Sequence, residues 1–170
     1  AEQALIAVRD AGRTVLDELR DMLAVLRHGA TDDAPRGALP TLDDLPALVD
    51  AMRATGLATT WTESGQPRPL ASPVSLAAYR IIQEALTNAI KHSGADTIEI
   101  SLESDSHALR LQVRDNGVGF DIGDGLAGSS LGLSSMKERA QLAGGSLTIH
   151  SQSGNGTTVS AVVPCGGLAR

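Results

Sequence analysis

Apolar side chains recur with the period of a helix between Ser72 and Gly94, the most regularly patterned stretch of the chain. At about 100° per residue they form one continuous arc, which consists of Ala78, Tyr79, Ile81, Ile82, Ala85, Leu86, Ala89 and Ile90. The opposite arc is polar, and Glu84, Asn88 and Lys91 lie along it at spacings of four and three. The opening serine can cap a helix, the proline suits its first turn, and the final glycine suits its end. We therefore predict a helix with one buried face and one polar face.

Residues 1–27 carry apolar positions at alternating steps of three and four, the spacing of a helix that packs on another helix. These positions are Leu5, Val8, Gly12, Val15, Leu19, Met22 and Leu26. Residues 28–40 contain two prolines and two glycines without a period, which predicts a linker. Because the chain opens on Ala1 within a helical pattern, we expect a piece of a longer protein. The partner of this first helix would then lie upstream or on another subunit.

A short helix and a strand are predicted between the linker and the main helix. Thr41 can cap the helix, two aspartates occupy its first turn, and Gly56 can end it. Its inward side would consist of Leu42, Leu45, Leu48, Val49 and Met52. Residues 57–63 alternate in character as a strand does, and residues 64–67 suit a turn.

The second half of the chain predicts two strand pairs separated by a loop and a helix. The first pair turns at 105–107 and the second at 153–156, and a glycine-rich loop precedes the helix between them. The inward positions would be Ile98, Ile100, Leu102, Leu109, Leu111, Val113, Leu133, Met136, Ala140, Leu147, Ile149, Val159, Ala161 and Val163. Strand pairs joined by short turns indicate a mixed sheet with helices on one face. We predict an α+β fold, a two-layer α/β sandwich preceded by a long helix.

Asp115 continues the alternation of the strand before it and therefore falls on the buried face. A buried carboxylate is costly unless a donor hydrogen-bonds to it. An aspartate before Asn-Gly is more often a turn former than a site. The inward position of Asp115, together with Gly119 downstream, favours a binding site.

Composition and missing motifs narrow the choice of function. A net charge of −6 over 170 residues argues against a general binder of nucleic acid or anionic membrane. No apolar run approaches the roughly 20 residues that span a bilayer, and the single cysteine, Cys165, excludes an internal disulfide. The chain lacks a P-loop, the HRD and DFG signatures of protein kinases, GxSxG, and histidines at metal-ligand spacing.

The remaining polar residues suit a purine nucleotide. Asp115 can accept a hydrogen bond from an amino group at C6 of a purine, whereas guanine presents an oxygen there and would be repelled. The glycines two and four residues later allow the backbone to approach a base closely. Asn88 offers an oxygen to Mg²⁺, and Lys91 can reach phosphate oxygens. The segment 129–132 opens a helix whose free N–H groups suit a polyphosphate.

Four segments carry a resemblance to a known family: QEALTNAIKHS, DNGVGF, SLGLSSMKERA and GGSLTIHSQSGNGTTV. In this order they resemble the ATP-binding domain of bacterial sensor histidine kinases, of the superfamily shared with DNA gyrase and the mismatch-repair ATPases. YRIIQEALTNAIKHS and LGLSSMKERA look most like the nitrate/nitrite-sensor branch. The resemblance covers 41–164, followed by a tail at 165–170. ELRDMLAVLR, at the end of 1–27, is similar to the second helix of that branch's dimerisation hairpin.

The resemblance implies a role for each matching residue. Asn88 would bind Mg²⁺, Asp115 would bind the adenine amino group, and Glu84 would act in catalysis and contact the metal through water. The ATP-binding set would be Asn88, Lys91, His92, Asp115, Gly117, Gly119, Ser130, Leu131, Gly132, Leu133 and Thr157. Residues 120–131 look like a lid over the nucleotide. Ser130 replaces a glycine that many relatives have, from which we expect altered lid mobility rather than lost binding.

Two of these residues also have interpretations that involve no binding site. Glu84 can be a salt-bridge partner of Lys91, and His92 a charge at a helix C-terminus. The implied function is transfer of the γ-phosphoryl group of Mg·ATP to a histidine on the preceding helix, outside this fragment. The acidic neighbour of that histidine would be the base.

The resemblance also implies partners and a location. The phosphoryl group would pass to an aspartate of a response regulator with a helix-turn-helix output domain. The whole protein would form a homodimer through its helical hairpin, in the cytoplasm, with any membrane anchor outside this fragment and no direct contact with nucleic acid. The alternatives are a gyrase-type ATPase that uses Glu84 to activate water, and a non-catalytic dimerisation or docking module.

Overall fold

The computed structural model describes residues 39–66, 69–121 and 130–165. They belong to one compact unit that begins at Leu39. The helical elements are η1 (Leu42–Asp44, a 3₁₀ turn), α2 (Leu45–Ala54), α3 (Ser72–Asn88), η2 (Ala89–Ser93, a π turn) and α4 (Ser130–Leu142). The strands are β1 (Ala58–Gly65), β2 (Thr97–Ser104), β3 (Ala108–Asp115), β4 (Ser146–Ser151) and β5 (Thr157–Pro164).

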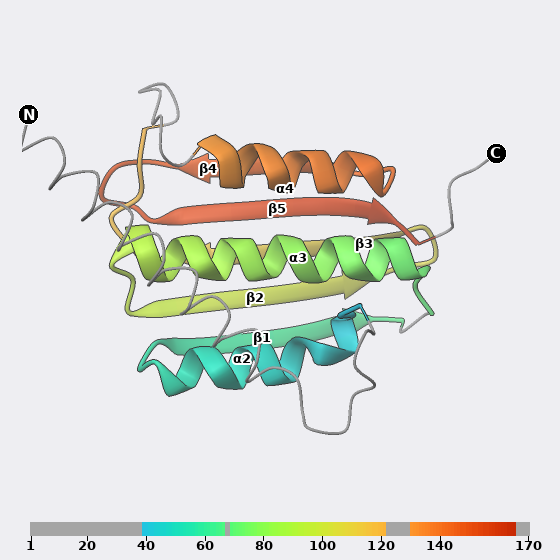
Figure 1. Ribbon diagram of the computed structural model, residues 1–170, viewed down its shortest axis with the longest axis horizontal. Coiled ribbons are helices and arrows are strands. Elements are labelled where there is room, and N and C mark those ends of the chain that lie inside the picture. Colours follow the sequence, from blue (N-terminus) through green and yellow to red (C-terminus); the bar gives the residue numbers. More distant parts are fainter. Residues whose placement is uncertain (1–38, 67–68, 122–129, 166–170) are drawn as a thin grey trace, which may run out of the picture. The chain divides into compact units, whose positions relative to one another are not determined.

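The strands form one sheet in the order β1-β2-β3-β5-β4. β1 and β2 are parallel and the other neighbours are antiparallel, so the sheet is mixed. Figure 1 shows α2, α3 and α4 side by side across one face of this sheet. The predicted α+β sandwich and its order of elements are confirmed.

The pairing of β2 with β3 separates the two faces of the sheet. Ile100 lies opposite Val113 and Leu102 opposite Leu111, and these four side chains are buried under the helices. On the open face the register places Glu99 opposite Arg114 and Glu103 opposite Arg110. Opposite charges at facing positions stabilise a sheet by roughly 0.2–1 kcal/mol per pair. The register therefore buries the apolar side chains and leaves the charged side chains exposed to solvent.

The main helix differs from its prediction at both ends. Ser72 lies inside α3, and Ala71, without a side-chain hydrogen bond, takes the cap position. At the other end the α-helix stops at Asn88 and continues as the π turn η2, which Gly94 ends in the left-handed conformation with φ 57°. A π turn has more residues per turn than an α-helix, so the phase of the side chains shifts. Ile90, predicted to be buried, is 44% exposed for this reason.

The short helix after the linker has the predicted cap at Thr41, although its first turn is the 3₁₀ turn η1. Thr41 accepts a hydrogen bond from the N–H of Asp43, and Asp44 accepts one from the N–H of Thr41 at 2.8 Å, which completes a capping box. Leu42 is only partly buried, because it lies in the 3₁₀ turn ahead of α2. The strand β1 runs to Gly65, two residues beyond the prediction.

Several predictions lie outside the described residues: the helix at 1–27, most of the linker and most of the lid. Among the helices that the structure describes, none is long and apolar enough to cross a membrane.

Candidate functional site

A cavity of about 420 Å³ lies where the end of α3 and the turn η2 meet the neighbouring ends of β3, β5 and α4. Its described lining residues are Ala85, Asn88, His92, Ser93, Val113, Asp115, Gly119, Phe120, Leu133, Thr157 and Val159. The volume falls in the range of about 300–1,000 Å³ that small-molecule sites occupy. Apolar walls and a few polar groups are the usual composition of such sites.

Asp115 supplies the buried charge in this cavity. It ends β3, is 8% exposed and lies between Ile98 of β2 and Thr157 of β5. Its Oδ1 accepts a hydrogen bond from the N–H of Gly117 at 2.9 Å. A carboxylate has about four acceptor positions, so this bond leaves capacity for a donor on a ligand. The predicted inward orientation is confirmed.

The two glycines after Asp115 are required by packing. A Cβ on Gly117 would collide with the side chain and carbonyl oxygen of Ser93. Gly119 has φ 60°, and a Cβ there would collide with the carbonyl oxygen of Gln152 in the β4–β5 turn. Gly119 lines the cavity, whereas Gly117 is buried against η2. Close approach of their backbones to a base stays a prediction.

The opposite wall comes from the end of α3. Asn88 and His92 both line the cavity; Asn88 is partly buried and His92 is exposed. His92 and Ser93 are the last two residues of the π turn η2, which continues α3 after Asn88. Lys91 is exposed and is not among the described lining residues.

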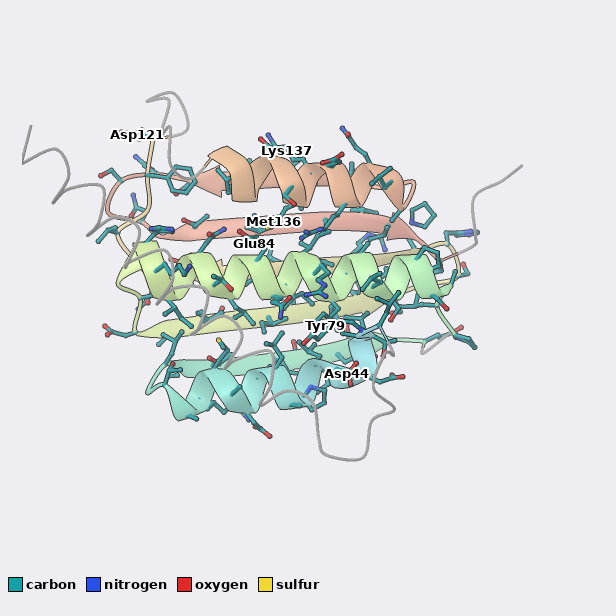
Figure 2. The ribbon with its side chains drawn as sticks, viewed as in Figure 1. Asp44, Tyr79, Glu84, Asp121, Met136 and Lys137 are labelled. Carbon is teal, nitrogen blue, oxygen red and sulfur yellow. The ribbon has the colours of Figure 1, made fainter. Side chains whose placement is uncertain are left out.

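Glu84 lies one turn before Asn88, on the side of α3 that faces α4 (Figure 2). Its Oε1 touches the position that a Cβ on Gly132 would occupy, and Nδ2 of Asn88 lies 3.6 Å from the same position. The structure therefore brings together three predicted residues from α3 and α4, two helices that are far apart in the sequence.

The remaining predicted residues lie in α4 and β5. The helix α4 begins at Ser130, followed by Leu131, and the side chains of these two residues are outside the described set. Leu133 and Thr157 line the cavity. The hydroxyl of Thr157 lies 3.0 Å from that of Ser151.

Sequence reasoning missed one serine that lines this cavity and a second that holds two of its lining residues, Phe120 and Thr157. Ser93 lines the cavity and is the last residue of the segment QEALTNAIKHS, for which the resemblance implied no role at this position. Ser151 accepts a hydrogen bond from the N–H of Phe120 at 2.9 Å and donates one to the carbonyl of Gly156 at 3.1 Å. These bonds hold the segment after Gly119 against the β4–β5 turn. No local sequence signal marks a serine in a strand for this role.

The donor set near Gly132 fits a magnesium ion. Mg²⁺ prefers oxygen ligands and usually keeps several waters, with one or two carboxylates and the phosphates of a substrate. Glu84 supplies a carboxylate, and Asn88, one helical turn later in α3, supplies a side-chain amide that carries an oxygen. Within the described residues no group of three or more His, Cys, Asp or Glu side chains is placed to hold a metal. Phosphates and waters would thus provide most of the ligands.

Comparison with known proteins gives the family. Residues 74–167 match the family described as histidine kinase-, DNA gyrase B-, and HSP90-like ATPase. The chain belongs to this family. The matched residues include most of α3 and all of η2, β3, α4 and β5, which supply residues to the cavity. The predicted resemblance to the ATP-binding domain of sensor histidine kinases is therefore confirmed.

Two relatives among characterised proteins are named as histidine kinases. The chain is 45% identical over 86 residues to the oxygen sensor histidine kinase NreB of Staphylococcus carnosus, a match that covers 51% of this chain and 25% of NreB. It is 37% identical over 170 residues to the sensor histidine kinase MctS of Rhizobium johnstonii, which covers 92% of this chain and 36% of MctS. The chain thus spans about a quarter to a third of these two relatives.

Solved structures share the fold. The ATP binding domain of PrrB from Mycobacterium tuberculosis is 25% identical with a TM-score of 0.54, covering 69% of this chain and 87% of that one. The histidine kinase AdeS of Acinetobacter baumannii is 19% identical with a TM-score of 0.58, covering 89% of this chain and 79% of that one.

Proposed function

We propose that this domain binds Mg·ATP in the cavity and presents the γ-phosphoryl group to a histidine of a sensor histidine kinase. The observation that supports this most is the buried carboxylate of Asp115, which lies in the wall of a cavity that Asn88 lines from α3. Family membership supports ATP as the nucleotide.

Adenine fits the inner part of the cavity. Val113, Leu133 and Val159 supply apolar walls for the ring. The carboxylate of Asp115 would accept a hydrogen bond from the 6-amino group. Such a bond to a charged group is worth roughly 1.5–3 kcal/mol. Guanine, with an acceptor at that position, would instead face the carboxylate with like polarity. The site therefore selects adenine.

The phosphates would lie at the outer part, between α3 and the start of α4. Asn88 and Glu84 would hold the magnesium ion, which neutralises phosphate charge when bound. Lys91 and His92, both exposed in the turn η2, would contact phosphate oxygens. The N-terminal turn of α4 adds backbone N–H groups and the positive end of a helix dipole. Phosphoryl transfer depends mainly on such positioning and charge neutralisation.

The chemistry at the acceptor takes place outside the described residues. A histidine nitrogen forms a bond to the γ-phosphorus while the bond to the bridging oxygen breaks and ADP leaves. In the whole protein we propose a homodimer in the cytoplasm. It would pass the phosphoryl group on to an aspartate of a response regulator with a helix-turn-helix output domain.

A binding assay and a labelling assay test the proposal on the 170-residue chain. We expect Mg·ATP to raise its melting temperature and to give a saturable calorimetric signal. Incubation with γ-labelled ATP should leave no acid-labile label on this chain, because the acceptor histidine lies elsewhere.

Three results would contradict the proposal. An acid-labile label on the chain would place the acceptor within it. Steady phosphate release that Glu84→Ala abolishes would indicate a gyrase-type ATPase. Absence of any protection by Mg·ATP would indicate a docking module.

A further inference from the structure

Ser93 joins the end of the main helix to the loop that carries Asp115. It is 6% exposed and is the last residue of the π turn η2. Its hydroxyl donates a hydrogen bond to the carbonyl of Ala89 at 2.6 Å and accepts one from the N–H of Ala95 at 3.2 Å. A serine hydroxyl has one proton, so Ser93 has no donor left for a ligand. Its hydroxyl therefore holds the π turn closed.

The backbone of Ser93 holds the Asp115 loop in turn. Its carbonyl accepts a hydrogen bond from the N–H of Val118 at 2.7 Å. Gly117, the residue before Val118, packs directly on the side chain of Ser93, with no room for a Cβ. The N–H of Gly117 donates to the carboxylate of Asp115 at 2.9 Å. A continuous series of contacts thus runs from the π turn to the carboxylate.

We infer that Ser93 is a positioning residue for adenine selectivity, which acts through Gly117 on the carboxylate of Asp115; this rests on the proposed function. The loop has a second support, because Oδ1 of Asn116 accepts hydrogen bonds from the N–H groups of Asp96 and Thr97. That support fixes the outer side of the loop. Ser93 fixes the inner side, which contains the N–H that orients the carboxylate.

The test compares ATP with inosine triphosphate, which has an oxygen in place of the 6-amino group. Ser93→Ala removes both hydroxyl hydrogen bonds and lets the π turn relax. We expect the affinity for Mg·ATP to fall about fivefold, the equivalent of roughly one hydrogen bond, and the affinity for inosine triphosphate to change much less. The ratio of the two affinities then falls. Ser93→Thr keeps the hydroxyl, which can still bond the carbonyl four residues earlier, and should retain most of the ratio.

Ser75→Ala is the matched control. Ser75 is likewise a buried serine, in the first turn of α3, and its hydroxyl accepts a hydrogen bond from the N–H of Leu42 at 2.9 Å. It does not line the cavity. This variant should lose stability but keep the ratio of affinities.

The outcomes separate the inference from the proposal on which it rests. If Ser93→Ala weakens both nucleotides equally, its effect is only structural and the inference is wrong. If Ser93→Ala binds both nucleotides as tightly as the wild type does, the inference is wrong as well. A wild-type chain that binds neither nucleotide, or both equally, contradicts the proposed adenine site first and removes the basis of the inference with it.

Discussion

Gly132→Ala should separate the stability of the domain from its affinity for nucleotide. Gly132 is the third residue of α4, and an added Cβ would meet Oε1 of Glu84. That atom is the end of a flexible side chain, so Glu84 can rotate away. The rotation costs roughly 0.5–1.5 kcal/mol if it leaves a favoured rotamer. Alanine in place of glycine in a helix contributes about 1 kcal/mol in the opposite direction. The free energy of unfolding should therefore change by less than about 1 kcal/mol.

The same rotation moves a carboxylate away from Asn88, where we place the magnesium ion. Losing one interaction between charged groups costs roughly 1.5 kcal/mol, so Mg·ATP should bind about tenfold more weakly. Urea unfolding followed by the fluorescence of Trp61, the single tryptophan, measures stability, and calorimetry measures affinity. Glu84→Ala and the double variant complete a cycle. Once Glu84 is truncated, Gly132→Ala should cause no further loss. Wild-type affinity in the single variant, or additive losses in the double one, would refute this reasoning.

Two further predictions concern the rest of the fold. Burial, and secondarily the charge of Asp44, raises the pKa of Tyr79 above its ordinary 10.0. The stability that this shift contributes is present below pH 10 and is lost as the pH rises through the higher folded value. Tyr79 is the single tyrosine, so an absorbance titration should give a higher midpoint for the folded chain than for the unfolded chain. Asp44→Asn should lower the folded midpoint only partly, because burial is the larger cause of the shift. Equal midpoints for the folded and unfolded chains would contradict this prediction. Gly119→Ala should lower the free energy of unfolding more than Gly94→Ala does. The two glycines have φ values of 60° and 57°, so alanine at either position costs about 1–2 kcal/mol of backbone strain. At Gly119 the added Cβ would also collide with the carbonyl oxygen of Gln152, which costs roughly 1–3 kcal/mol more, whereas at Gly94 the space is open. Equal losses in urea unfolding would show that the collision is relieved.

The sandwich and the orientation of Asp115 could be predicted because both depend on a period of two. Each strand alternates, and the last residue of β3 inherits its face from Val113 two positions earlier. The orientation of Asp115 could therefore be predicted without any information on tertiary contacts. The cap at Thr41 followed from local chemistry in the same way.

Contacts between distant segments could not be predicted. The π turn has no signature in the residues that form it, and it exposes Ile90 against a helical pattern that continues to favour burial. The packing of Gly117 on Ser93, and of Gly132 on Glu84, depends on how β3 and α4 lie against α3. Sequence reasoning attributed the two glycines to the ligand, whereas the structure adds a requirement from protein contacts.

The most direct test is a calorimetric titration of the wild-type chain and Asp115→Asn with ATP and with inosine triphosphate, in the presence of Mg²⁺. Asparagine keeps an oxygen for the N–H of Gly117 but can turn an amide N–H toward the base. We predict that the substitution weakens ATP about tenfold or more, while inosine triphosphate binds the variant at least as well as the wild type. Equal affinity of wild type and variant for both nucleotides would contradict the assignment of Asp115 to the adenine amino group.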